Sequence, residues 1–319
     1  MDATGRQAIV TAALGEGSVV TAGVRLPGGA SRETWAIDAL DAGGASHELI
    51  LRLDSPGASP GAGIGLSGEA ALMRAAAAGG VPVPRILSAG DGHVLMTRVA
   101  GETIPRKILR DEAFAAARPR LAGRCGEILA AIHRMPLSCL PQATPRPQAV
   151  PDDPLATWRD LLDLTGQPHP VFELGFRRLA ASRPVSHRVT VVHGDFRNGN
   201  LVVGPDGVEA VLDWELAHAG DPLEDLGWLC VKAWRFGSPL PVGGFGEYAQ
   251  LVESYEKASG HPVDPDALRW WETFGVLKWG VICIMQTMRH LSGGARSVEL
   301  AAIGRRVCET EWDLLHLLQ

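Results

Sequence analysis

The sequence predicts an α+β protein of two lobes, in which a small antiparallel β-sheet with one helix precedes a larger, mostly helical lobe. Over the first hundred residues, short runs alternate between apolar and polar side chains, as half-buried strands do. After Gly101 the segments lengthen, and apolar residues recur at helical spacing. We therefore divide the chain into an N-terminal lobe at 1–97, a hinge at 98–104 and a helical lobe at 105–319.

The N-terminal lobe is expected to hold five strands. Turn-forming residues at 27–31 and 41–44 separate the first three runs, which suits hairpin connections. The one helix is predicted at 66–78, because this segment is rich in Ala, Leu, Glu and Met and ends at a Gly-Gly pair. The predicted strands are 19–26, 33–40, 47–53, 85–87 and 93–99.

The second lobe is predicted to be helical at 121–135, 155–164 and 172–181, and almost continuously from Leu223 to the end. A Pro-rich stretch at 136–154 interrupts the helices. A loop of this length is either a surface excursion or part of a binding site.

Composition narrows the class of protein. The chain has 319 residues, a formal net charge of -6 and no run of Lys or Arg, so nucleic acid is not an expected partner. Its five cysteines lie far apart without a C-x-x-C motif, which argues against a zinc site and a disulfide framework. No leader-like segment or membrane-spanning apolar run is visible, so we expect a cytoplasmic protein without a membrane partner. The sequence does not indicate an oligomeric state.

A short hairpin in the helical half carries the strongest functional pattern. A strand at 189–192 runs into residues 193–200, His-Gly-Asp-Phe-Arg-Asn-Gly-Asn, and strands at 201–203 and 208–212 follow. In such a hairpin the residue entering the first strand lies beside the residue leaving the second, so Asn200 and Asp213 should meet. Asp195 can overhang the same point. Two carboxylates and a carboxamide are the oxygen ligands that suit Mg²⁺ with nucleotide phosphates.

The same residues carry a resemblance to a known family. The string H-x-D-x-x-x-x-N, with an Asp-aromatic pair thirteen residues beyond the Asn, resembles the catalytic core of protein-kinase-like enzymes. With Leu-Asp-Trp-Glu at 212–215, Gly-Asp-Pro at 220–222 and Asp-Leu at 225–226, the chain resembles the aminoglycoside phosphotransferase family. It is most similar to the branch related to the kinase-like domains of acyl-CoA dehydrogenase fusion proteins. The resemblance covers nearly the whole chain and implies a bilobal, protein-kinase-like fold.

The resemblance implies a role for each residue of the hairpin. Asp195 would accept the proton of the attacking hydroxyl, and Arg197 would neutralise charge on the transferred group. Asn200 and Asp213 would hold Mg²⁺ on the phosphates of ATP or GTP. His193 is expected to be structural, hydrogen-bonded to backbone, and Asp225 to bridge its helix to the 193–200 loop.

In the N-terminal lobe the resemblance implies a nucleotide site. Residues Gly28, Gly29 and Ser31 would belong to the hairpin that covers the nucleotide, and the 96–101 segment, with Met96 and Arg98, would form the hinge. Arg52 would face the phosphates, paired with Glu69. Family members usually have Lys in place of Arg52, and Arg has a bulkier, forked head group. This departure leaves a nucleotide-binding pseudokinase as an alternative.

The predicted function is therefore an ATP- or GTP-dependent kinase that phosphorylates the hydroxyl of a small molecule. A metal-dependent hydrolase built on His193, Asp195 and Asp213 is a further alternative. The segment 269–291 contains a single acid, Glu272, among many apolar residues. This favours an acceptor less charged than an aminoglycoside, such as a hydroxyacyl thioester or another hydroxylated metabolite. The late aromatic residues are expected to be mostly core, with some lining the acceptor site: Trp270, Trp271, Phe274, Trp279 and Trp312.

Overall fold

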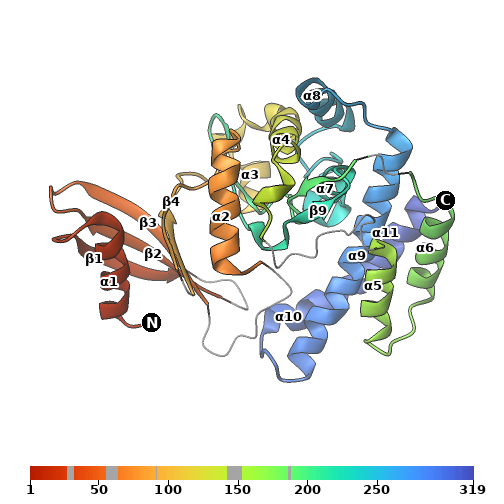
Figure 1. Cartoon of the computed structure of the whole chain (residues 1–319). Coiled ribbons are helices and arrows are strands. Elements are labelled where there is room, and N and C mark those ends of the chain that lie inside the picture. Colours follow the sequence, from red (N-terminus) through yellow and green to blue (C-terminus); the bar gives the residue numbers. More distant parts are fainter. Residues whose placement is uncertain (27–31, 55–63, 91, 142–152, 186–187) are drawn as a thin grey trace.

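The computed structural model describes the chain except residues 27–31, 55–63, 91, 142–152 and 186–187 (Figure 1). It confirms the predicted fold class: an antiparallel sheet with helices precedes a larger, mostly helical part. The boundaries at residues 97 and 104 stay a prediction. Within the described residues no helix is both long and apolar enough to cross a membrane. The five cysteines are all described and all free.

The N-terminal sheet has the strand order β1-β2-β3-β5-β4, and every neighbouring pair is antiparallel. All five predicted strands are present, the first with the predicted bounds and the other four with shifted ends. Their bounds are β1 Val19–Leu26, β2 Arg32–Leu40, β3 Ser46–Asp54, β4 Ile86–Gly90 and β5 His93–Thr97.

Two helices cover opposite faces of this sheet. Leu49 and Leu51 of β3 pack with Val10 of α1 (Ala3–Leu14), whereas Ile50 packs into the cluster that contains α2 (Gly65–Ala78). Because side chains alternate along a strand, Arg52 faces the α2 side with Ile50. Helix α2 is the predicted one. Helix α1 was not predicted from the sequence, because it buries a single residue and has no apolar stripe.

The C-terminal part is built around one long helix, α9, which begins at Pro265 after Asp264 caps its first turn. Helices α7, α10 and α11 pack along α9, while α4 packs against α8 (Figure 1). The helices are α3 Pro105–Arg110, α4 Arg118–His133, α5 Pro154–Asp163, α6 Pro170–Ala181, α7 Leu223–Cys230, α8 Tyr248–Ser259, α9 Pro265–Leu291, α10 Val298–Ile303 and α11 Val307–Leu317.

Two short antiparallel pairs lie among these helices. The predicted hairpin is formed by β7 (Leu201–Gly204) and β8 (Gly207–Val211). Strand β6 (Thr190–Val192), which was predicted, pairs with β9 (His218–Gly220). Strand β9 was not predicted. Of the 136–154 loop, the structure describes a short 3₁₀ turn at Leu137–Cys139 and the start of α5; the remainder lies largely outside the described residues.

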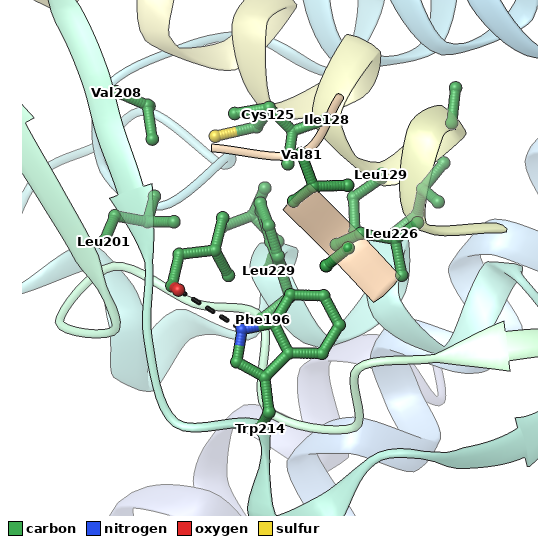
Figure 2. Close-up of a cluster of buried hydrophobic side chains, with 14 of the residues drawn as sticks. Val81, Cys125, Ile128, Leu129, Phe196, Leu201, Val208, Trp214, Leu226 and Leu229 are labelled. Atoms are coloured by element: carbon green, nitrogen blue, oxygen red, sulfur yellow. Dashed lines mark hydrogen bonds between the residues drawn. The ribbon is translucent and has the colours of Figure 1, made fainter. Parts of the chain in front are cut away.

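An apolar cluster anchors the hairpin to the helices (Figure 2). Trp214, fully buried, follows β8 and donates its indole N–H to the carbonyl of Val211 across 3.2 Å. Leu201 and Val208 of the two strands pack into the same cluster as Leu226 and Leu229 of α7. The hairpin thus shares one apolar cluster with α4 and α7, and its open end carries the candidate site.

Candidate active site

The β7–β8 hairpin brings Asn200 and Asp213 together as predicted. Leu201 pairs with Val211, and the amide of Leu212 donates to the carbonyl of Asn200 across 2.8 Å. Asp213 then adopts a left-handed conformation, with φ of 66°. Such a conformation is uncommon for a residue other than glycine, and here it turns the chain away from the strand directly at the site.

Three side-chain donors hold the carboxylate of Asp195. Asn200 donates its amide N–H to Oδ2 across 2.6 Å, and Trp228 of α7 donates its indole N–H to Oδ1 across 2.7 Å. The Nε of Arg197 lies 3.1 Å from Oδ1. The guanidinium of Arg197 stacks 4.6 Å from the ring centroid of Trp234. Asp195 is thereby fixed in orientation and carries the charge-assisted contacts expected of a functional carboxylate.

Asp225 of α7 bridges to the 193–200 loop, which confirms the expectation for this residue. Its Oδ2 accepts the amide N–H of His193 at 2.8 Å, and its Oδ1 accepts that of Gly194 at 2.9 Å. His133 of α4 contacts Oδ2 at 3.2 Å. Burial of Asp225 opposes its ionisation, but His133 and His193 outweigh this effect and lower its pKa.

A buried lysine supports the same loop from α9. The Nζ of Lys278 lies 3.4 Å from the carbonyl of Gly194, 3.1 Å from Oε1 of Glu224 and 4.7 Å from the ring centroid of Trp228. Burial opposes the charge of Glu224, yet Lys278 and His218 lower its pKa to about 2. Lys278 and Trp228 were not identified from the sequence, since each reaches the loop from a distant helix.

The histidines of this region use both ring nitrogens on protein partners. Nε2 of His193 lies 3.1 Å from the carbonyl of Leu212, and its Nδ1 accepts the amide of Asp195 at 3.2 Å. This confirms that His193 is structural. His218 likewise contacts the carbonyl of Leu216 and Glu224. Across the described part of the chain, no three His, Cys, Asp or Glu side chains are grouped to hold a metal.

Asn200 and Asp213 fit a magnesium ion. The side-chain nitrogen of Asn200 is turned toward Asp195, which leaves the amide oxygen for another partner. Oδ1 of Asp213 is buried and has no hydrogen-bond partner, and the Nη2 of Arg52 lies 3.7 Å from it. A buried carboxylate oxygen without a hydrogen bond is unfavourable. A divalent cation held by oxygen ligands would satisfy it.

A cluster of charged groups from the N-terminal sheet, α2 and the segment after β8 borders this point. Arg52 pairs with Oε1 of the buried Glu69, so the expected pair is formed. Arg32, which the sequence did not single out, contacts Oε2 of Glu69 at 2.9 Å and Oε2 of Glu215 at 3.1 Å. Burial, and then the neighbouring Asp213, raise the pKa of Glu215. Burial opposes the charge of Arg52, but Glu69 and Asp213 raise its pKa.

The remaining predicted positions are less closely associated with the site. Gly28, Gly29 and Ser31 lie outside the described residues. Met96 is buried in β5, opposite Ile50. Arg98 pairs with Asp38 and Glu48, and Glu48 is four residues from Arg52 along β3, so the structure does not bring Arg98 to the Asp213 end of the site.

A row of indoles leads away from Asp195. Trp228, which donates to Asp195, contacts the ring of Trp234 at 5.2 Å between centroids, and Trp234 contacts Trp279 at 4.8 Å. Of the aromatic residues singled out from the sequence, Trp279 therefore extends this row. The others are core or surface: Trp270, Trp271 and Phe274 are buried in the α9 cluster, and Trp312 is exposed.

Comparisons with known proteins agree with this geometry. A model of the phosphotransferase enzyme family (APH) matches residues 23–271, more than half of the chain. Among curated proteins, acyl-CoA dehydrogenase family member 10 of Mus musculus is 29% identical over an alignment of 293 residues. That alignment covers 84% of this chain and 27% of the mouse protein, so the chain spans about a quarter of this relative's length.

Solved structures share the fold at low sequence identity. A Ralstonia eutropha protein described as an aminoglycoside phosphotransferase aligns with a TM-score of 0.74 and 20% identity, covering 99% of this chain and 98% of that one. Aminoglycoside phosphotransferase APH(4)-Ia, solved with AMP-PNP and hygromycin B, aligns with a TM-score of 0.60 and 18% identity, covering 99% and 98% of the two chains. These likenesses establish the fold.

Proposed function

Because the chain belongs to the phosphotransferase enzyme family (APH), whose model matches residues 23–271, we propose that it is a magnesium-dependent kinase of small molecules. It would transfer the γ-phosphoryl group of ATP or GTP to a substrate hydroxyl. Solved relatives bound to nucleotides, among them the ATP complex of APH(2")-IIa with streptomycin, support a nucleotide donor.

One observation carries this proposal: Asp195, Asn200 and Asp213 converge on one point beside a charged cluster that suits phosphates. Asn200 links the two carboxylates, since its side chain binds Asp195 and its carbonyl accepts the amide N–H of Leu212, the residue before Asp213. Oδ1 of Asp213, which is buried without a hydrogen bond, supports a cation at this point. Within the kinase class, such an arrangement serves positioning and charge neutralisation rather than covalent catalysis.

Each residue of the hairpin then has a role in the proposed reaction. The acceptor hydroxyl would donate a hydrogen bond to Asp195, which takes its proton as the oxygen attacks the γ-phosphorus; the bond from this phosphorus to the β,γ-bridging oxygen would break, and ADP or GDP would leave. Asn200 and Asp213 would hold Mg²⁺, which when bound neutralises phosphate charge. Arg197, next to Asp195, would stabilise negative charge on the transferred group. Asp225 and Lys278 would keep the 193–200 loop in the geometry that these contacts need.

In the N-terminal lobe, Arg52 would bind the phosphates while Glu69 holds its guanidinium in place. The covering role of Gly28, Gly29 and Ser31 and the hinge role of Met96 and Arg98 remain part of the proposal.

The nucleotide site is tested by ligand-induced stabilisation, because a ligand that binds only the folded state raises its melting temperature. Wild type, Asp213→Asn and the control Asp206→Asn are titrated with ATP and GTP, with and without magnesium. Asp206 is exposed in the turn of the same hairpin and far from its open end. A magnesium-dependent shift in wild type and Asp206→Asn, lost in Asp213→Asn, is expected. No shift with either nucleotide in wild type would reject the kinase.

Phosphoryl transfer separates a kinase from a pseudokinase. Wild type and Asp195→Asn are incubated with magnesium and γ-labelled nucleotide in the presence of candidate acceptors. Transfer by wild type that falls about 10²-fold or more in Asp195→Asn supports the proposed base. Nucleotide binding without transfer to any acceptor would favour the regulatory module.

We further propose that the acceptor is neutral or partly apolar. The side chains around Asp195 include the indoles of Trp228 and Trp234, the guanidinium of Arg197 and the buried ammonium of Lys278. These groups suit an apolar or uncharged acceptor better than a polycation, which would be held by carboxylates. The mouse relative named for acyl-CoA dehydrogenase adds a hydroxyacyl thioester to the candidates.

This finer proposal is tested by comparing acceptors at equal concentration. Hydroxyacyl thioesters of increasing chain length are assayed beside streptomycin and hygromycin B, which occur in relatives' structures. Turnover that increases with chain length, at least tenfold above that of both aminoglycosides, is the expected result. Preference for either aminoglycoside would reject the neutral acceptor and leave the kinase assignment intact.

A further inference from the structure

Arg32 is surrounded by carboxylates from both lobes. It begins β2, and its guanidinium lies 2.9 Å from Oε2 of Glu69, 3.1 Å from Oε2 of Glu215 and 3.5 Å from Oδ1 of Asp54. Its side chain is 11% exposed. The family resemblance places the segment 28–34 in the nucleotide-covering hairpin but gives Arg32 no contact of its own.

Strand pairing explains why Arg32 lies beside Arg52. Arg32 pairs with Asp54 and Thr34 pairs with Arg52, so the two arginines are diagonal neighbours. Alternation along β2 and β3 directs both side chains to the α2 face of the sheet. There they share the single buried carboxylate of Glu69, Arg52 on Oε1 and Arg32 on Oε2. Glu69 and the more exposed Asp54 balance the two guanidinium charges on this face and hold both guanidinium groups in place.

Glu215, another partner of Arg32, belongs to the C-terminal part of the chain. It follows Asp213 by two residues, and its side chain is 36% exposed, whereas that of Glu69 is 2% exposed. Of the two contacts at or below 3.1 Å, the pair with Glu215 is therefore the more solvated and the weaker. Glu215 is also the partner of Arg32 that lies close to the candidate magnesium ligand, Asp213, in the sequence. Breaking the ion pair between Glu215 and Arg32 therefore costs little free energy, while Glu69 continues to orient the guanidinium.

We propose that Arg32 is a second phosphate-binding residue beside Arg52, and that Glu215 occupies it while no nucleotide is bound. The inference rests on the proposed nucleotide site. A polyphosphate carries more negative charge than one carboxylate and matches the fork of a guanidinium. Nucleotide binding therefore exchanges the pair between Arg32 and Glu215 for pairs between Arg32 and phosphate oxygens. Glu215 competes with the nucleotide for the same cation.

The competition predicts effects of opposite sign. Arg32→Gln removes a charge-assisted phosphate contact and should weaken ATP binding about tenfold or more. Glu215→Gln frees Arg32 and should tighten ATP binding about threefold to tenfold. In the double variant the gain from Glu215→Gln should vanish, because the cation for which it competes is absent.

Calorimetric titration with ATP in the presence of magnesium tests this, because the proposed nucleotide site depends on magnesium. The control Arg25→Gln removes an exposed arginine of β1 that pairs with Glu33 and should not change affinity. Arg32→Gln within twofold of wild type, or Glu215→Gln that weakens binding, would overturn the inference. If wild type binds ATP and GTP in neither the presence nor the absence of magnesium, the nucleotide site itself fails.

The test does not depend on one variant folding. Arg32→Lys keeps the charge and a single contact to Glu69, so it should bind ATP more weakly than wild type and more tightly than Arg32→Gln. Glu215→Gln alters a partly exposed side chain and reports the competition by itself. Binding by Arg32→Lys that equals wild type, together with no change in Glu215→Gln, would assign Arg32 a purely structural role.

Discussion

The side-chain amide of Asn200 donates to Oδ2 of Asp195 across 2.6 Å and to the carbonyl of the same residue across 2.9 Å. The proposed metal ligand thus also orients the proposed base. Any movement of the hairpin end would displace both groups together. The relative positions of Asn200 and Asp195 therefore depend on the contacts that hold the 193–200 loop and its hairpin.

Gly194→Ala tests the most crowded position of the loop. Gly194 has φ of +81°, and an added Cβ would lie 2.5 Å from the carbonyl oxygen of Leu216. We expect phosphoryl transfer to fall at least tenfold and stability to fall by about 2 kcal/mol or more, because the backbone must shift. The control Gly207→Ala has φ of +146° but open space around the added carbon, so transfer should be unchanged. Equal transfer rates in both variants would contradict the prediction.

Trp228→Phe tests the hydrogen bond to Asp195. The change keeps an aromatic ring but removes the indole donor at 2.7 Å, so we expect transfer to fall about tenfold through loss of one hydrogen bond to a charged group. Trp271→Phe is the matched control, since Trp271 is also buried and its indole nitrogen has no hydrogen-bond partner. Both variants should lose similar stability in urea unfolding. A similar loss of transfer in Trp271→Phe would show that packing alone is responsible.

Arg52→Lys tests the departure from the family pattern. The guanidinium pairs with Glu69 through Nη1 and lies 3.7 Å from Asp213 through Nη2, and a single ammonium cannot span both positions. We expect Arg52→Lys to bind nucleotide about threefold to tenfold more weakly and still to transfer phosphate, whereas Arg52→Met should lose transfer. Arg74→Lys, on the exposed side of α2, is the control. Tighter binding by Arg52→Lys would mean that Arg52 impairs the site.

The stability of the folded protein at acidic pH depends on Glu224. Its pKa falls from 4.5 to about 2 in the folded protein because Lys278 and His218 outweigh the effect of burial. A lowered folded pKa stabilises the protein above about pH 4.5, and this contribution, about 3 kcal/mol, is lost as the pH falls toward 2. Glu224→Gln should therefore be less stable than wild type at pH 7, with the difference shrinking below pH 4.5. Urea unfolding between pH 3 and 7 measures it.

The control for this pH series is Glu209→Gln, because Glu209 is exposed on β8. Its difference from wild type should stay small and independent of pH. A gap between wild type and Glu224→Gln that persists unchanged at pH 3 would mean that the ion pair with Lys278 does not carry the effect.

The sequence predicted those parts of the fold and the site that depend on local pattern. Alternation and turn residues identified the strands of the sheet, and the hairpin geometry correctly joined Asn200 to Asp213. The bridging role of Asp225 was also correct. Each of these inferences needed only residues close in sequence or a motif with a fixed register.

Contacts between distant segments were not predictable in the same way. Trp228 reaches Asp195 from 33 residues away, and Lys278 reaches Gly194 from 84 residues away. On sequence alone each is an ordinary residue of an apolar helix. Arg32 comes directly after a predicted turn in the sequence. Its position beside Arg52 could be found only from the exact strand register. Helix α1 lacked an amphipathic stripe because the sheet contacts it through few side chains.

The support that α9 gives to the 193–200 loop has a consequence during synthesis. Lys278 is translated 84 residues after Gly194, which at ~5–20 residues per second is a delay of about 4 to 17 s. Throughout that interval the nascent chain carries Asp195 without the ammonium that holds the neighbouring carbonyl. The contact to the carbonyl of Gly194 is thus acquired late, and a chain truncated before α9 would retain the motif and the side-chain partners of Asp195 while lacking this ammonium.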